Sequence, residues 1–357
     1  MADEQTSGLR ESRPDFFVGG EEKPDLAGGL SALTIRENTE GLYRCEATFG
    51  NWGTKDTTTD YLYFDRKVLD FGKDFQVKLG GKVIFDGRVM ALEANYPEGQ
   101  SPEISVLAED RFQDLRMTRR TRTFADSSDS DVFNQIASDH GLSPSVDVQA
   151  PTYKVLAQVN QSDLAFMRER ARTIGAELWM DGKTLNVKTR SGRNGSTVDM
   201  TKGNDLREFR VLADLAMQRT AVKVSCWDVP GKQSQDADAD DSAISSELNG
   251  DESGVSILQS AIGARKESLA HTVTLNSDEA KAAADNFFRL CARRFVVGYG
   301  VAETKADVRV GNYVNLKELG ALFSGKYYLT ETKILFDSAK GIRTEFRAER
   351  VGIGRGR

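Results

Sequence analysis

The sequence is poor in the residues on which most hydrolytic and metal-dependent chemistry relies. Its 357 residues include only three cysteines and two histidines. Cys45, Cys226 and Cys291 are far apart and form no C-x-x-C pair, and His140 and His271 belong to no H-E-x-x-H pattern. These absences argue against a disulfide framework, a zinc knuckle and most histidine-dependent catalysis.

Long hydrophobic runs and nucleotide-binding loops are missing as well. The longest apolar runs, such as 295–297, fall far short of the ~20 residues of a membrane span, and the N-terminus has no signal pattern. Neither a G-x-x-x-x-G-K-[ST] phosphate loop nor a G-x-S-x-G nucleophile elbow is present. We therefore expect no stable membrane insertion, no cofactor, no catalytic residues and no enzymatic activity.

Negative charge is concentrated in one stretch of the chain. The formal net charge is -6, and residues 233–264 contain seven acids and no Lys or Arg. Without these seven charges the remaining chain carries about +1. The stretch is rich in Ser, Ala, Gln and Gly and has little apolar periodicity, which predicts a mobile acidic loop over 233–264. One hypothesis is that this loop steers partners electrostatically.

The acidic stretch also contains a candidate metal site. Asp236, Asp238, Asp240 and Glu247 occupy the first, third, fifth and twelfth positions of a calcium-binding loop. The sixth position, which needs glycine for a sharp turn, is Asp241. A solvated loop is therefore the stronger interpretation, and no metal is expected.

Short alternating segments dominate the first third of the chain. After a flexible polar arm over residues 1–13, apolar and polar residues alternate through 33–49 and 75–107. This pattern predicts a first antiparallel β-barrel domain over residues 14–122. The basic run 116–122 has no interleaved aromatic residue, so we expect a solvated or interface face there and no nucleic-acid partner.

The hydrophobic period becomes helical in the middle of the chain. Ser128 and Asp131 are spaced as a capping box before apolar residues at helical spacing. A second helix is predicted over 162–174, with Gly175 as its stop, and a hairpin follows. These signals predict a small α/β domain over residues 123–190.

Strand patterns return in the last third. They predict a second β-barrel domain over residues 191–351, which contains the acidic loop and a helix over 277–294. A strand is expected at 271–275, and residues 352–357 are expected to form a flexible tail. The predicted fold class is therefore mainly β with an α/β insert.

The first and last β blocks resemble each other. Motifs at 77–79, 84–89 and 108–111 line up in order with motifs at 314–316, 322–327 and 348–350. The alignment makes two pairs of turn residues equivalent, and we expect them at interfaces: Phe85 and Arg88, Phe323 and Lys326. Two related barrels in each chain would let a trimer present six similar surfaces.

Three segments carry a family resemblance. The run QSDLAFMRERARTIGAELWMDGKTLNV at 161–187 resembles the centre of the phage late control protein D family. The segments VGNYVNL at 310–316 and FSGKYYLTET at 323–332 are similar to the ending of that family. The resemblance covers roughly residues 15–351 and extends in weaker form to the hub half of the type VI secretion spike protein.

What the resemblance implies is a structural baseplate hub of a contractile phage tail or contractile injection system. Such hubs are homotrimers whose barrels form a pseudo-six-fold ring. The implied partners are the hexameric inner tube protein, a trimeric spike protein that would be a separate subunit, and baseplate wedge proteins. The implied location is the cytoplasm during assembly and afterwards the baseplate of a virion or injection particle.

Two other interpretations of the sequence remain open. A β-rich module that binds a carbohydrate or a cell-surface ligand without catalysis is the main alternative. A hydrolase that uses unrecognised carboxylates ranks third, because 54 acids always offer a pair but no pattern singles one out.

Overall fold

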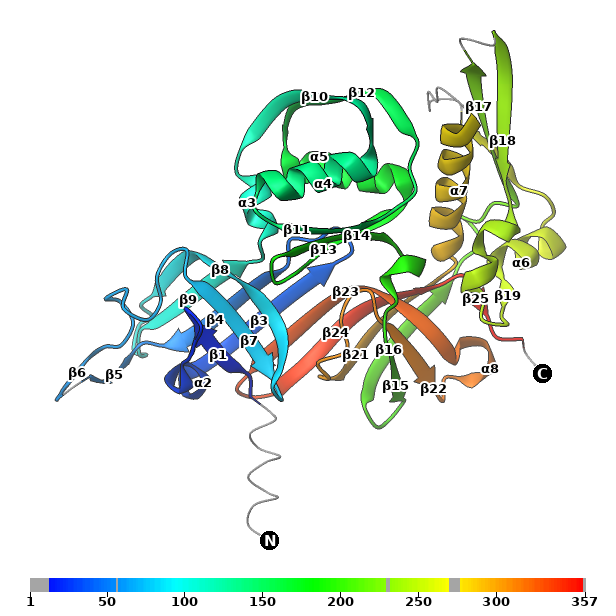
Figure 1. Cartoon of the computed structure of the whole chain (residues 1–357). Helices are drawn as coiled ribbons and strands as arrows, with labels where there is room; N and C mark the ends of the chain where they lie inside the picture. The colour runs from blue at the N-terminus through cyan, green and yellow to red at the C-terminus, as the bar shows by residue number, and fades with distance from the viewer. Residues whose placement is uncertain (1–12, 56, 229–231, 270–276, 356–357) are drawn as a thin grey trace.

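A sheet of 13 strands runs through most of the chain in the computed structural model, which describes residues 13–55, 57–228, 232–269 and 277–355 (Figure 1). The sheet is largely antiparallel, and an α/β unit lies on one of its faces. The predicted class, mainly β with an α/β insert, is confirmed. The sheet is continuous between the two expected barrel domains.

The first β unit comprises the strands up to residue 109. Along its strands buried and exposed residues alternate, and Phe16, Phe49 and Phe75 lie in its core. A hairpin arm, β5–β6, projects from it (Figure 1). Its elements are β1 (Asp15–Val18), β2 (Glu21–Glu22), α2 (Pro24–Gly29), β3 (Leu30–Asn38), β4 (Arg44–Gly50), β5 (Trp52–Lys55), β6 (Thr58–Tyr61), β7 (Asp74–Leu79), β8 (Lys82–Asn95) and β9 (Glu103–Glu109).

The second β unit has its own apolar core. Phe346, Tyr327 and Leu329 belong to that core. Its elements are β15 (Thr197–Thr201), β16 (Leu206–Ala213), β21 (Val296–Glu303), β22 (Tyr313–Lys317), α8 (Gly320–Phe323), β23 (Gly325–Asp337) and β24 (Gly341–Arg350).

The two β units repeat one strand order. Hydrogen-bonded neighbours run β3-β4-β9-β8-β7-β1 in the first unit and β16-β21-β24-β23-β22-β15 in the second. The last pair differs, since β1 is antiparallel to β7 whereas β15 is parallel to β22. The units join where β23 pairs with β3. The sequence repeat therefore corresponds to a repeat of topology.

The α/β unit follows the predicted local signals. Ser128 and Asp131 form the capping box of α4, and Gly175 ends α5 with φ +67°. The expected boundary at 122 falls within β10, and Phe112 and Leu115 of α3 already pack in the core of this unit. Its elements are α3 (Phe112–Arg116), β10 (Arg119–Ser128), α4 (Asp129–Asp139), β11 (Ser143–Asp147), β12 (Thr152–Ser162), α5 (Asp163–Ile174), β13 (Ala176–Asp181), β14 (Thr184–Thr189) and the 3-10 turn η1 (Ser191–Arg193).

The expected acidic loop over 233–264 is wrong, because most of this stretch has regular structure. Its apolar residues, such as Ala239, Ile244 and Val255, pack in one cluster with Phe288 of α7, which coincides with the predicted helix over 277–294. We name these elements the appendage: β17 (Ala221–Asp228), β18 (Gln233–Ala239), η2 (Asp241–Glu247), β19 (Glu252–Ser253), α6 (Gly254–Ala261), β20 (Lys266–Leu269) and α7 (Ser277–Arg293).

Two smaller expectations concern the ends of elements. The tail expected from residue 352 begins with an ordered strand, β25 (Gly352–Ile353), because it pairs with β19 of the appendage. The strand expected at 271–275 and most of the arm at 1–13 lie outside the described residues.

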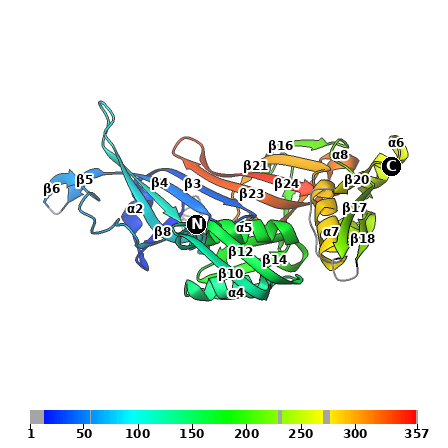
Figure 2. The same cartoon turned by 90° about the horizontal axis from the view of Figure 1, so that it is seen from above.

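The molecule is elongated when seen from above, with the two β units end to end (Figure 2). The α/β unit lies against the region where they join. α7 with β17 and β18 lies at the end of the second β unit that is far from the first unit (Figures 1 and 2). Among the described helices, none is both long and apolar enough to cross a bilayer.

Candidate assembly surface

The junction between the two β units is a packed strand pair. β23 and β3 run antiparallel, with Ile334 opposite Ile35 and Phe336 opposite Leu33. Ile35 and Ile334 are 0% and 1% exposed. Because hydrogen bonds and apolar contacts both cross this pair, the two units form one body.

A buried charge completes the junction. Glu37 of β3 lies opposite Thr332 of β23 and forms an ion pair with Arg309. The other Glu37 oxygen accepts hydrogen bonds from the Val310 N–H and the Thr332 hydroxyl, both at 3.2 Å. Both carboxylate oxygens of Glu37 are therefore paired, as a buried charge requires.

The topological repeat leaves two strand edges open. β16 is the counterpart of β3, and in the described part of the chain it pairs along its length only with β21. β8 is the counterpart of β23, and its residues 91–95 pair with β9 on one edge, while β7 pairs only with residues 82–88. The internal junction joins a β23 edge to a β3 edge. The chain therefore has one further edge of each type that is open, on β8 and on β16.

Apolar residues on these edges are incompletely covered. Phe209, Val211 and Ala213 of β16 are half-buried, although their counterparts in β3 are buried. On the β8 side Leu92 is half-buried and Tyr96, just after the strand, is 61% exposed. Each edge therefore carries a core-facing row of side chains that lacks a neighbour.

An aromatic cluster adjoins the β8 edge. The ring of Tyr96 lies 5.8 Å from that of Phe64 and 6.3 Å from that of Tyr61, and Trp52 contacts Tyr61 from the arm. A hollow of about 170 Å³ beside the cluster is lined by residues of β8 and β9 and of the segment that follows β6, among them Leu92, Ala94, Tyr96, Phe64 and Ile104. Exposed aromatic patches of this kind are typical of interaction surfaces.

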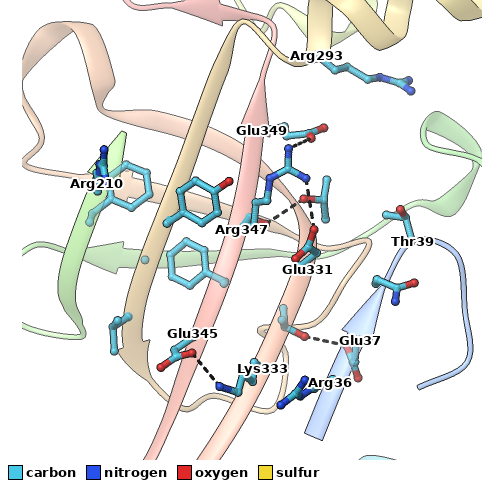
Figure 3. A pocket seen from close by; sticks show the side chains of 18 of the residues that line it. Arg36, Glu37, Thr39, Arg210, Arg293, Glu331, Lys333, Glu345, Arg347 and Glu349 are labelled. Carbon is cyan, nitrogen blue, oxygen red and sulfur yellow. Dashed lines mark hydrogen bonds and ion pairs between the residues drawn. The ribbon is translucent and has the colours of Figure 1, made fainter. Parts of the chain in front are cut away.

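The sheet face beside the α/β unit and α7 forms a wide groove of about 1160 Å³ (Figure 3). Charged side chains from neighbouring strands are paired across it. Arg347 binds Glu331 at 3.4 Å and Glu349 at 3.2 Å, and Lys333 approaches Glu345 at 3.5 Å. The alternation of signs along the strands distributes the charge over the face.

Buried arginines fix the units around this groove. Arg190, next to η1, binds Glu349 of β24 at 3.1 Å, and Arg293 of α7 binds Glu247 at 2.7 Å. Burial alone would raise the pKa of Glu247, but the Arg293 guanidinium outweighs it and holds that pKa below its usual range. The first contact joins the α/β unit to the second β unit, and the second joins α7 to η2 within the appendage.

The four candidate calcium ligands have separate roles. Asp236 pairs with Lys223 on β17 at 2.6 Å, and Asp240 caps η2 by accepting a hydrogen bond from the Ser242 N–H. Glu247 binds Arg293, and Asp238 of β18 lies opposite Lys223 of β17. Within the described residues no group of three or more His, Cys, Asp or Glu is arranged to hold a metal. Asp236, Glu247 and Asp251 form ion pairs with bases of other elements, so these acids do not form an isolated negative patch. Electrostatic steering of partners by this stretch stays a prediction.

The predicted turn residues lie at different places in the two units. Phe85 is buried within β8, and Arg88 forms an ion pair with Asp114 at 3.0 Å. Phe323 ends α8, and the Lys326 ammonium lies 4.0 Å from the centre of the Tyr313 ring. Phe85 to Arg88 is therefore strand and not turn, and an interface role for these four residues stays a prediction.

The motif alignment is also two residues out of register in β8. Val89 lies opposite Ala108, and the residue opposite the equivalent Ala348 is Leu329, not Tyr327. Both strands have a register shift directly after this position. The pairing registers thus provide the correct equivalence between the units.

Sequence reasoning missed the two open edges. The alternations Phe209-Val211-Ala213 and Leu92-Ala94-Tyr96 are strand signals of the usual kind. Nothing in such a pattern tells an edge strand from a central one, so the missing partner is visible only in the sheet order.

Among solved structures, tail proteins share this fold. The prophage MuSo2 43 kDa tail protein of Shewanella oneidensis matches with a TM-score of 0.68 and 13% identity over 95% of this chain and 98% of its own. A tail protein of Neisseria meningitidis MC58 matches with a TM-score of 0.67 and 13% identity over 96% and 97% of the two chains.

A secretion-system protein is also similar. An Escherichia coli component of the type VI secretion system, described as structurally similar to the T4 bacteriophage tail proteins gp27 and gp5, matches with a TM-score of 0.56 and 10% identity. The match covers 96% of this chain and 79% of that one. The expected likeness to tail and secretion proteins is therefore confirmed at the level of the fold.

The sequence comparisons add a family. No curated protein matches the sequence. The family model of the Alg8 N-terminal domain matches residues 55–334, which is more than three quarters of the chain. This family is not the one that the sequence motifs resemble. On the strength of that match the chain belongs to the Alg8 N-terminal domain family, and it has the fold of phage tail proteins.

Proposed function

We propose that this chain is a non-catalytic structural subunit of a contractile phage tail or contractile injection system, acting as the hub between inner tube and spike. The observation that carries the proposal is the repeat of one strand order in two β units on a fold shared with tail proteins. Three such chains contain six similar β units. A ring of this kind can contact a six-fold tube on one side and a three-fold spike on the other.

The partners follow from that geometry. They are further copies of this chain, an inner tube protein, a spike protein and baseplate wedge proteins, as in the late control protein D family. The wide groove supports a structural role, because its pairs Arg347–Glu331 and Lys333–Glu345 use charged groups that a substrate would otherwise engage. In the described residues no group of three or more His, Cys, Asp or Glu is arranged to hold a metal ion.

The proposal is tested by assembly. The purified chain is measured by light scattering coupled to size exclusion, alone and mixed with candidate tube and spike proteins from the same genome. We expect three copies per particle, rings in negative-stain images, and a complex that contains both partners. A chain that stays monomeric and binds neither partner would overturn the proposal.

A further inference from the structure

We propose that the open edge of β8 pairs with β16 of the next copy, antiparallel and in one defined register, with Ala94 opposite Val211. This inference rests on the proposed function, since it gives the contact by which copies join head to tail. The template is the internal junction, in which the counterparts β23 and β3 make the same pairing.

The β8 side of the register follows from shared pairings. Val89 lies opposite Ala108 as Leu329 lies opposite Ala348, and both strands shift register before the next paired residue. Ala94 then pairs with Ile104 as Ile334 pairs with Thr344. Ala94 is therefore the counterpart of Ile334.

The β16 side follows in the same way. In the first unit Ile35 pairs with Cys45, which pairs with Ala108. In the second unit Val211 pairs with Gly298, which pairs with Ala348. Val211 is therefore the counterpart of Ile35, and the internal pair Ile334–Ile35 predicts the pair Ala94–Val211 between copies.

The side chains on the two edges are complementary in this register. Leu92, Ala94 and Tyr96 would face Ala213, Val211 and Phe209 of the next copy, so the two core-facing rows cover each other. Phe209 would reach the aromatic cluster of Tyr96, Phe64 and Tyr61, next to the hollow of about 170 Å³. Burial of exposed apolar and aromatic surface would drive the contact, and main-chain hydrogen bonds would align it.

The other face of the same pairing has exposed residues that suit a test. Glu93 would lie opposite Leu212, which is 63% exposed, and Asn95 would lie opposite Arg210. These positions correspond to the internal pairs Lys333–Arg36 and Leu335–Thr34. Neither Glu93 nor Leu212 has a core role, so both can be replaced without opening a cavity.

Disulfide trapping between copies tests the register. The full chain carrying Glu93→Cys and Leu212→Cys is oxidised in the presence of the tube and spike proteins and analysed by non-reducing electrophoresis. We expect a ladder that ends at three linked copies. The matched control, Glu93→Cys with Arg210→Cys, shifts one cysteine by about 6.6 Å along the strand and should not cross-link. Each single-cysteine variant gives the background.

The outcomes separate this inference from the proposed function. Cross-linking of the control pair, or of neither pair, in a chain that light scattering shows to be trimeric would overturn the register and leave the hub function standing. A monomer that neither cross-links nor binds its partners would overturn both. As a second variant, Val211→Asp should abolish the trimer and leave the circular dichroism spectrum unchanged, whereas a trimer that survives this change would contradict the pairing.

Discussion

The two β units pack differently at one equivalent strand pair, β4 with β9 in the first unit and β21 with β24 in the second. The first unit has Ala47 opposite Val106, and the second has Gly300 opposite Phe346 at the equivalent positions. A Cβ on Gly300 would collide with the Phe346 ring. The strand order is the same in both units, but in the second unit a smaller residue on one strand is matched by a larger residue on its neighbour. Such compensation is expected of a densely packed core.

A second pair of equivalent positions has opposite charges. Asp110 directly follows Glu109 at the end of β9, and Arg350 follows Glu349 in β24. Asp110 is buried and accepts hydrogen bonds from the Tyr43 and Phe112 N–H groups at 2.8 and 2.9 Å. Arg350 instead donates to Asp251 of the appendage at 2.6 Å. The units therefore share a backbone plan, but each has its own polar contacts.

The largest effect is expected at the junction that makes the units one body. Glu37→Gln would leave Arg309 without its carboxylate partner, at a cost of about 3 kcal/mol, the lower end for a broken buried pair because Arg309 keeps some solvent access. Urea unfolding at pH 7 measures the loss. The exposed control Glu208→Gln on β16 should change the free energy of unfolding by less than about 0.5 kcal/mol. Equal losses in both variants would contradict a special role for the buried pair.

The volume exchange between the units can be tested by making them alike. Gly300→Ala should destabilise the protein by about 1–3 kcal/mol through the clash with Phe346. Adding Phe346→Val reproduces the Ala47–Val106 pair of the first unit. The double variant should therefore be less destabilised than the sum of the two single variants, measured by thermal and urea unfolding. Strict additivity would show that the two positions do not compensate each other.

A pH dependence should distinguish Asp110 from its counterpart Arg350. Burial raises the pKa of Asp110 to about 7, and the two N–H donors only partly offset it. The folded state thus binds this proton more tightly than the unfolded chain, so the stabilisation is fully present below pH 4 and is lost as the pH rises through 7. Between pH 6 and 8 the protein should lose about 1.4 kcal/mol relative to Asp110→Asn.

The measurement is urea unfolding of both proteins at several pH values. Parallel stability curves for the two proteins would show that Asp110 is ionised throughout this range. Arg350 should add no pH dependence to the free energy of unfolding in this range. Burial alone would lower the pKa of its guanidinium, but Asp251 outweighs burial and raises that pKa above its usual value.

The smallest effect is expected in the appendage, which only the second unit carries. Asp236 and Lys223 form an ion pair at 2.6 Å, but both side chains are more than 40% exposed. Asp236→Asn should therefore leave the free energy of unfolding almost unchanged. A larger loss in urea unfolding would mean that the acidic residues stabilise the appendage directly.

Local signals predicted the α/β unit well, and tertiary pairing decided the rest. The capping box at Ser128 and the left-handed Gly175 act within a few residues, so the sequence alone was enough to find them. β18, by contrast, has only alanines as apolar residues and is stabilised by pairing with Val222 and Val224 of β17. Considered without β17, the sequence of β18 has the composition of a loop.

The candidate assembly surface was only partly predictable. The repeat of motifs indicated two related β units, but the motif alignment was two residues out of register in β8. Both units have the same register shift, at Val89 and at Leu329, so the shift does not produce this offset. The motif alignment matches Phe85 and Gly87 to Phe323 and Gly325 by residue type, and residue type does not determine which residues lie opposite each other in the sheet. Which strands lie at the edges depends on the whole sheet and not on any one segment.

The open edges of β8 and β16 make the free subunit directional. A chain with one edge of each type cannot pair both within itself. Every added copy uses one of its edges to join and leaves the other open, so a linear assembly keeps one open edge of each type until its ends meet. Curvature therefore decides between a closed circle and an endless fibre. A partner that holds the first copies at the correct curvature would favour the closed ring over the filament.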